Sequence, residues 1–230
     1  MGSEDDPVGD TWHNYWSSTP DSSYLRFEAR VVATNLREHL PLEPSQTILD
    51  FGCGYGYVAE FLSEHVEHVY IWDAVEEVRE SAHRRINRAN VSISSAGDQD
   101  VDVILANSVI QYMDQEALGS WLVRWKDQLR SGGHIVLSDV LTTPPSLPRE
   151  TLHWFLLAAR NGQFAASIGF ARANASRYQA AKDSKPLTVY TPATLRALGS
   201  DAGLEMTEAS SNYAFQPRRS TFLLRARNQG

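Results

Sequence analysis

The sequence predicts an α/β fold in which helices cover both faces of a doubly wound, mostly parallel sheet. Short apolar runs alternate with segments of helical periodicity between residues 47 and 141, and such alternation implies right-handed crossovers. The first apolar run stops at the closely spaced glycines of residues 52–56, as a buried strand does before a tight turn into a helix. The length of 230 residues suits one sizeable domain with a small addition.

Residues 1–46 are expected to form an N-terminal segment that serves as a lid. A polar, acidic start is followed by three aromatic residues, Trp12, Tyr15 and Trp16. A helix is expected next, because possible N-caps at residues 21–23 precede apolar residues that recur every three or four positions. Pro41 and Pro44 should end this helix, since proline does not continue one.

Residues 47–141 are expected to form the ligand-binding core of the fold. The expected strands are residues 47–51, 68–73, 91–94, 101–106 and 134–139. Helical periodicity lies between them at residues 58–66, 75–88 and 118–129. Residues 131–133 (SGG) are predicted to turn the chain into the fifth strand.

The chain changes character after residue 141. Residues 152–159 are apolar nearly all round, so this helix should be buried or should cover something. Residues 161–185 show a weak apolar stripe and are expected to be a helical insertion, so residues 142–190 are predicted to form a helical cap outside the sheet. Residues 191–230 should complete the core with a helix that starts at Thr191 and two closing strands.

Composition disfavours several classes of protein. The formal charge of −7 is opposite to what phosphate binding requires, so a nucleic-acid partner is not expected. Cys53 is the only cysteine, which excludes an intrachain disulfide and a thiol-rich zinc site, and we expect no metal ligands. The start lacks the pattern of a signal peptide, and no apolar run is long enough to span a bilayer. We therefore expect a cytoplasmic protein that does not enter a membrane.

The glycine-rich turn suits either a dinucleotide or S-adenosylmethionine as the ligand. The spacing is G-x-G-x-G, and Tyr57 stands where the dinucleotide fingerprint has its third glycine, which argues against NAD. Asp50 precedes the glycines, where its charge would repel a pyrophosphate but help to hold the α-ammonium of S-adenosylmethionine. Asp73, after the second strand, is placed to accept hydrogen bonds from both ribose hydroxyls.

Residues 48–56 (ILDFGCGYG) resemble the first motif of the class I, Rossmann-like S-adenosylmethionine-dependent methyltransferases. Residues 72–74 are similar to the second motif of that family, and residues 102–110 and 131–136 resemble its fourth and fifth strands with their turns. The resemblance covers residues 47–141 well, the C-terminal quarter fairly, and the rest poorly. It implies a seven-stranded sheet whose last strand is antiparallel.

The resemblance also implies a cofactor that lies across the glycine turn and the next strand ends. The expected cofactor-binding residues are Asp50, Gly52, Cys53, Gly54, Gly56, Asp73, Ala74, Asp98, Asn107 and Ser108. Asp98, or alternatively Ser95, is expected beside the adenine. Cys53 is expected to be a small side chain under the loop rather than a reactive thiol.

Side chains that touch the methyl acceptor are expected at strand ends and on the cap. The candidates for a catalytic role are Tyr112, Asp139 and His153, and the expected pocket residues are Trp16, Tyr112 and His153. His153 could equally be a satisfied buried histidine, Asp139 could cap a turn, and the N-terminal aromatics could simply pack. The aromatics could also cover the sulfonium, since aromatic faces attract cations.

The sequence is thus interpreted as a methyltransferase that moves the methyl of S-adenosylmethionine to a small molecule by direct in-line transfer. Two alternatives stay open: a protein or peptide acceptor, and a catalytically silent protein that binds the cofactor. An NAD-dependent enzyme is disfavoured by Tyr57. The sequence leaves open the acceptor, the methylated atom and the oligomeric state.

Overall fold

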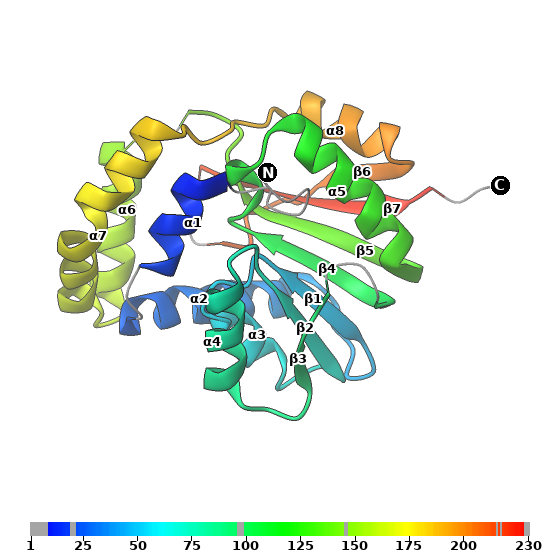
Figure 1. Cartoon of the computed structure of the whole chain (residues 1–230), viewed down its shortest axis with the longest axis horizontal. Coiled ribbons are helices and arrows are strands. Elements are labelled where there is room, and N and C mark those ends of the chain that lie inside the picture. Colours follow the sequence, from blue (N-terminus) through cyan, green and yellow to red (C-terminus); the bar gives the residue numbers. More distant parts are fainter. Residues whose placement is uncertain are drawn as a thin grey trace.

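A seven-stranded sheet organises the computed structural model, which describes residues 9–18, 22–95, 99–144, 147–214, 216 and 218–227. The strand order is β3-β2-β1-β4-β5-β7-β6, and β7 runs antiparallel to both of its neighbours while the other pairs are parallel (Figure 1). The strands are β1 Thr47–Phe51, β2 His68–Trp72, β3 Val91–Ile93, β4 Val101–Asn107, β5 Leu129–Val140, β6 Leu204–Glu208 and β7 Ser220–Ala226. The predicted α/β class and the antiparallel last strand are confirmed.

Helices cover both faces of the sheet and bury a separate apolar core on each (Figure 1). One core packs α2, α3 and α4 against the strands, and the other packs α5 and α8. These helices are α2 Ser23–His39, α3 Tyr57–Leu62, α4 Glu76–Ile86, α5 Gln115–Gln128 and α8 Pro192–Asp201. A short 3-10 helix, η1 Ile110–Tyr112, follows β4. Since both faces are filled, the strand ends are where a ligand can enter.

The N-terminal segment forms two helices, α1 Gly9–Ser17 and α2. Ser22 caps α2, because its side chain accepts a hydrogen bond from the Leu25 amide at 3.1 Å. The apolar stripe of α2 is buried, as its spacing predicts, and includes Val32 and Leu36. The extended residue Leu40 follows the helix, directly before Pro41.

Two further helices, α6 Leu147–Arg160 and α7 Phe164–Ser184, lie side by side beyond the sheet, on the same side as α1 (Figure 1). α7 contacts α1 and α2, so the insertion predicted near residues 161–185 does join the N-terminal helices. Of the two alternatives for residues 152–159, burial of the whole helix is wrong, and a covering role stays a prediction. Leu152 is 60% exposed and Leu156 is 49% exposed, because α6 packs through one side while its outer side faces solvent.

Two boundaries also differ from the prediction. The glycines expected to form a turn at residues 131–133 belong to β5, which begins at Leu129. Gly132 has a φ of +83°, and a Cβ on Gly133 would lie 2.8 Å from the carbonyl oxygen of Asp102. The two glycines therefore allow the irregular pairing of β5 with β4 at this point. Helix α3 ends at Leu62, earlier than the apolar spacing to Val66 predicts.

Candidate functional site

The glycine turn between β1 and α3 has backbone conformations that favour glycine. Gly52, Gly54 and Gly56 have φ angles of +75°, +52° and +70°. A Cβ on Gly52 would lie 2.5 Å from a Val109 methyl, and one on Gly56 would lie 2.7 Å from Ile86 Cδ1. Nothing lies within 4 Å of the position of a Cβ on Gly54, so the middle glycine presents bare backbone to open space.

Asp73 joins the glycine turn to the end of β2. One carboxylate oxygen accepts the Gly54 amide at 2.9 Å and the other accepts the Val75 amide at 3.0 Å. Burial raises the pKa of Asp73, and these two hydrogen bonds oppose that rise. Each oxygen keeps a further lone pair, so the carboxylate can also accept from two ligand hydroxyls.

Asp50 is buried beneath the glycine turn at the end of β1. Burial, and then the charge of Asp73, raise the pKa of Asp50 to about 7, while a backbone hydrogen bond from Ala59 opposes the rise. Its Oδ2 atom has no hydrogen-bond partner among the described residues. A bound cation near this carboxylate would therefore stabilise its charged form.

Cys53 is buried under the same turn, and burial raises the pKa of its thiol well above the ordinary value. A thiol held in its protonated form is a poor nucleophile, which favours the interpretation of Cys53 as a packing residue.

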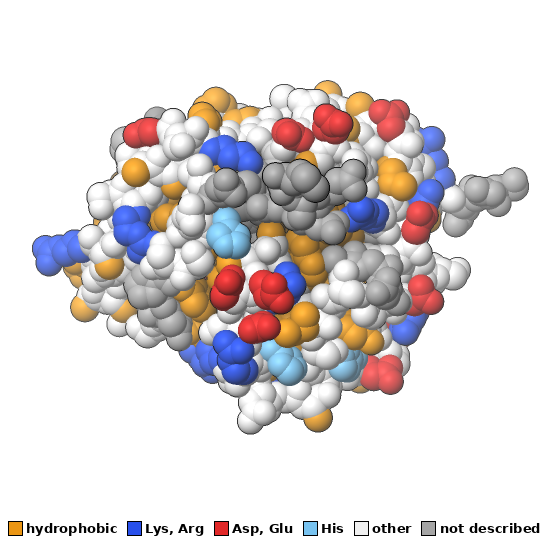
Figure 2. Space-filling view, viewed as in Figure 1, with side chains coloured by type: hydrophobic (Ala, Val, Ile, Leu, Met, Phe, Trp, Pro, Cys, Tyr) orange, Lys and Arg blue, Asp and Glu red, His pale blue; other side chains and the backbone are white. Residues whose placement is uncertain are grey.

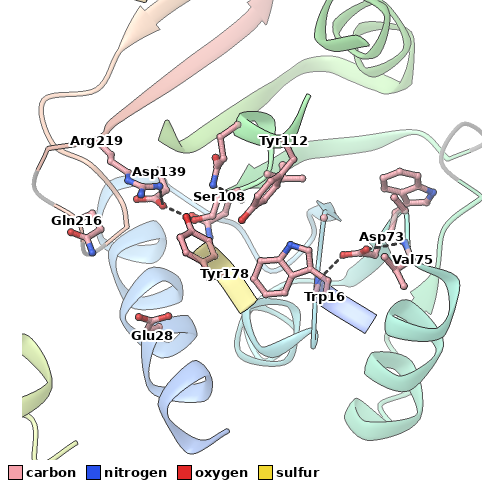
Figure 3. Close-up of a pocket in the computed structure, with 17 residues that line it drawn as sticks. Trp16, Glu28, Asp73, Val75, Ser108, Tyr112, Asp139, Tyr178, Gln216 and Arg219 are labelled. Atoms are coloured by element: carbon pink, nitrogen blue, oxygen red, sulfur yellow. Dashed lines mark hydrogen bonds and ion pairs between the residues drawn. The ribbon is translucent and has the colours of Figure 1, made fainter. Parts of the chain in front are cut away.

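A cavity runs from this turn across the ends of β2, β4 and β5 (Figure 3). Among the predicted cofactor residues, the cavity lining includes Gly52, Gly54, Asp73, Ala74, Asn107 and Ser108. Cys53 lines an adjoining hollow that shares Gly54 and Asn107 with the cavity. Asp50 and Gly56 belong to the lining of neither. Asp98 lies outside the described residues.

The ends of β4 and β5 carry strained backbone where they meet the cavity. Ser108 has a φ of +56° and Asp139 a φ of +60°, values that are uncommon for residues with a side chain. The Ser108 hydroxyl donates to Asp139 Oδ2 at 2.7 Å. The side-chain oxygen of Asn107, just before this turn, is buried and has no partner among the described residues, so it is available to a ligand.

Asp139 is held by an ion pair through its carboxylate and by a hydrogen bond through its backbone amide. Arg219 donates to Asp139 Oδ2 at 2.9 Å, and both side chains are almost fully buried. The Asp139 amide donates to Asn212 Oδ1 at 3.2 Å, which ties β5 to the segment before β7. These contacts fix the Asp139 carboxylate at the end of β5, which supports a positioning role; a catalytic role for Asp139 stays a prediction.

Aromatic rings from three separate parts of the chain cover the cavity. Trp12 is fully buried and lies 4.7 Å from the Tyr112 ring and 5.7 Å from the Tyr178 ring. Trp16, Tyr112 and Tyr178 line the cavity itself (Figure 3). Burial raises the pKa of Tyr112 well above its ordinary value, so this side chain stays a neutral hydroxyl. The N-terminal aromatics therefore both pack and contribute to the cavity wall.

His153 is an expected pocket residue and Glu28 is not, but the structure places Glu28 in the cavity lining and His153 outside it. His153 lies on α6 and is not part of the cavity lining. Its neighbour Trp154 instead donates from Nε1 to Glu28 Oε1 at 2.6 Å, and Glu28, on α2, lines the cavity. The sequence offers one signal for Glu28, which is its position directly before Ala29 of the buried stripe of α2. An acid at the edge of a buried stripe needs a hydrogen-bond partner or a ligand.

Metal ligands and membrane helices were also sought in the described part of the chain. No group of three or more His, Cys, Asp or Glu side chains there could hold a metal ion. None of the helices in those residue ranges is long and apolar enough to cross a membrane. On the face that Figure 2 shows, the coloured Lys and Arg side chains are interspersed with acidic ones and form no continuous basic stripe.

The fold, the glycine turn and the two strand-end carboxylates together define a protein built to bind a nucleoside-containing ligand. Residues 24–209 match the family model of a methyltransferase domain. The chain belongs to this family, of the class I S-adenosylmethionine-dependent kind, and S-adenosylmethionine is its cofactor.

Comparisons with known proteins agree with this fold. A structure of Haemonchus contortus phosphoethanolamine N-methyltransferase 1 with phosphoethanolamine and S-adenosylhomocysteine matches 96% of this chain and 48% of its own, with a TM-score of 0.63 and 16% identity. Magnesium protoporphyrin IX methyltransferase from Synechocystis PCC 6803, with bound S-adenosylhomocysteine, matches 94% of this chain and 91% of its own, with a TM-score of 0.53 and 14% identity.

In sequence, protein-L-isoaspartate O-methyltransferase 1 of Polaromonas sp. is 34% identical over 76 residues, which cover 33% of this chain and 29% of that protein. The chain thus aligns with less than a third of this relative and with about half of the Haemonchus contortus enzyme.

Proposed function

We propose that this protein transfers the methyl group of S-adenosylmethionine directly to a small-molecule acceptor. The observation that carries the proposal is the continuous cavity, which has Gly54 and Asp73 at one end and Asp139 and Glu28 at the other (Figure 3). A continuous lining allows two ligands to meet at the ends of β4 and β5, where in-line approach needs both to be fixed.

The cofactor end of the cavity has the groups that S-adenosylmethionine requires. When bound, the cofactor supplies an activated methyl group. Asp73 would accept the ribose hydroxyls, and Gly54 allows close approach of the backbone. Asn107 Oδ1 offers a buried acceptor, and Asp50 adds negative charge beneath the turn for the α-ammonium. Asp98, or alternatively Ser95, is proposed to contact the adenine.

The acceptor end is covered by elements outside the sheet, which supports a small acceptor. Residues 1–46 are proposed as a lid and residues 142–190 as a cap, since α1 and α7 contact one another over the cavity. Tyr178 of α7 and Trp16 of α1 contribute rings that exclude water (Figure 3). Exclusion of water protects the activated methyl group and strengthens the electrostatic interactions in the cavity.

A second candidate is a protein or peptide acceptor. The observation that favours it is the local identity to protein-L-isoaspartate O-methyltransferase 1 of Polaromonas sp. over 76 residues. A peptide would need an open groove, and the contacts of α7 with α1 and α2 cross the place where it would lie.

Calorimetry with S-adenosylmethionine, S-adenosylhomocysteine and NAD tests the cofactor. We expect the first two to bind and NAD not to bind; the reverse result would refute the proposal. Transfer of a labelled methyl group to a metabolite mixture, and in parallel to a peptide mixture, then distinguishes the two acceptor classes. The variant Asp73→Asn serves as the binding-deficient control. Cofactor binding with no transfer to either mixture would indicate a catalytically silent protein.

A further inference from the structure

Glu28 is a carboxylate inside the cavity, and the proposed methyl transfer assigns it no role. It projects from α2 and lies toward the end of the cavity that holds Asp139 and Arg219 (Figure 3). One oxygen accepts the Trp154 indole N–H at 2.6 Å, so α6 of the cap fixes the orientation of the carboxylate. A half-buried acid anchored in this way presents its remaining lone pairs to the cavity.

The charges around the cavity favour a cationic ligand near Glu28. The described lining residues include three carboxylates, Glu28, Asp73 and Asp139, and one guanidinium, that of Arg219. Arg219 forms its ion pair with Asp139 at 2.9 Å, and Asp73 holds the glycine turn. Glu28 has no ion pair with any cation in the described part of the chain. A positive group on the acceptor would complement this carboxylate, whereas an anionic acceptor would be repelled.

Aromatic side chains add to this preference. Trp16, Tyr112 and Tyr178 line the same cavity as Glu28. Aromatic faces attract an ammonium group, and the attraction is stronger where water is excluded.

We propose that the acceptor is a basic amine, and that Glu28 binds its ammonium group and takes the proton that leaves nitrogen. This inference rests on the proposed methyltransferase function and names the acceptor class of the same site. The ammonium passes one proton to Glu28, and the nitrogen lone pair then forms a bond to the methyl carbon. The carbon–sulfur bond breaks with its electron pair on sulfur, and Glu28 later releases the proton to solvent.

The acidity of Glu28 supports this role. Burial raises the pKa of Glu28 to about 7, the nearby Tyr24 hydroxyl and the Trp154 hydrogen bond lower it, and the charges of Asp139 and Arg219 act in opposite directions. A carboxylate with a pKa close to neutral accepts a proton more readily than an exposed one, yet it still ionises beside an ammonium.

The experiment compares binding of three similar probes to the protein saturated with S-adenosylhomocysteine. The probes are 2-phenylethylamine, 2-phenylethanol and phenylacetate, which differ in charge at one end. Calorimetry should show that the amine binds the wild-type protein roughly tenfold or more tightly than the other two, as a charged hydrogen bond requires. Glu28→Gln should remove this preference, because glutamine can still accept from Trp154 but carries no charge.

The matched control is Glu38→Gln, which removes the same charge from an exposed site on the same helix. It should keep the amine preference and the affinity for S-adenosylhomocysteine. Equal binding of the three probes, or of none, overturns the inference, as does an amine preference that survives in Glu28→Gln. A loss of S-adenosylhomocysteine affinity in Glu28→Gln would assign Glu28 to the cofactor instead. If the wild-type protein does not bind S-adenosylhomocysteine, the proposed function fails as well.

Discussion

Replacing Asp50 by asparagine should stabilise the ligand-free protein at pH 8 and weaken its binding of S-adenosylmethionine. Burial, and then the charge of Asp73, raise the pKa of Asp50 from 3.8 to about 7. The folded protein therefore holds a proton at pH 5 to 6 that the unfolded chain has lost. The stability that this proton provides is fully present below about pH 4 and is lost as the pH rises through 7.

The magnitude follows from the size of this pKa change. Three pKa units correspond to about 4 kcal/mol of the free energy of unfolding at pH 8. Asparagine has no charge to desolvate, and its amide oxygen can still accept the hydrogen bond from the Ala59 amide. Because a buried amide carries its own desolvation penalty, we expect Asp50→Asn to gain roughly 2–3 kcal/mol at pH 8 and little at pH 4.5.

Urea unfolding from pH 4.5 to 8.5 measures the stability, and calorimetry measures the affinity for S-adenosylmethionine. Asp100→Asn is the matched control, since Asp100 is exposed and should show neither effect. An equal gain at every pH, or none, would refute the claim that Asp50 bears an unfavourable charge when no ligand is bound. Unchanged affinity in Asp50→Asn would refute its role toward the α-ammonium.

Three further predictions concern the glycine turn and the charged groups. Asp73→Asn should lower the affinity for S-adenosylmethionine by roughly tenfold or more, as loss of a charged acceptor does, and unchanged affinity in calorimetry would remove Asp73 from the site. Gly56→Ala should reduce the free energy of unfolding by about 2–4 kcal/mol, but Gly162→Ala by only about 1 kcal/mol. Both glycines have a φ of +70°, but only a Cβ on Gly56 would overlap α4; equal losses in thermal melts would contradict this reasoning. Arg219→Met should destabilise by about 3 kcal/mol, because Asp139 would lose its buried ion-pair partner, and a loss within error of zero would argue against that pair.

The cofactor half of the cavity could be predicted because its signals are local in the sequence. A strand end, a left-handed glycine turn and an acid on the next strand are separated by few residues and have little freedom in where they meet. The parallel pairing of β1 with β2 aligns Phe51 with Trp72, so the residues that follow both strands reach the same edge of the sheet. Asp73 therefore lies beside Gly54, as its position in the sequence predicts.

The other half of the cavity could be predicted only in part: Trp16 and Tyr112, the expected pocket residues, line it, but contacts between distant segments decide the rest. The periodicity of residues 152–159 identifies a helix, but it does not say which face packs; the structure buries Ala158 and leaves Leu152 exposed. His153 stands out as a titratable residue on this helix, yet its neighbour Trp154 makes the contact with Glu28, which lies 126 positions earlier in the chain.

Glu28 gains its properties only from this long-range contact. On an isolated amphipathic helix, only its position beside Ala29 of the buried stripe separates Glu28 from the exposed Glu38. Once α6 and α2 enclose its carboxylate, burial raises its pKa to about 7 and the Trp154 hydrogen bond fixes its direction. Since the cap supplies both effects, a change of cap would alter the acidity of Glu28 without altering the glycine turn. If Glu28 binds the acceptor as we propose, cofactor binding and acceptor choice can vary separately in this fold, and the contacts of α6 with α2 decide the second.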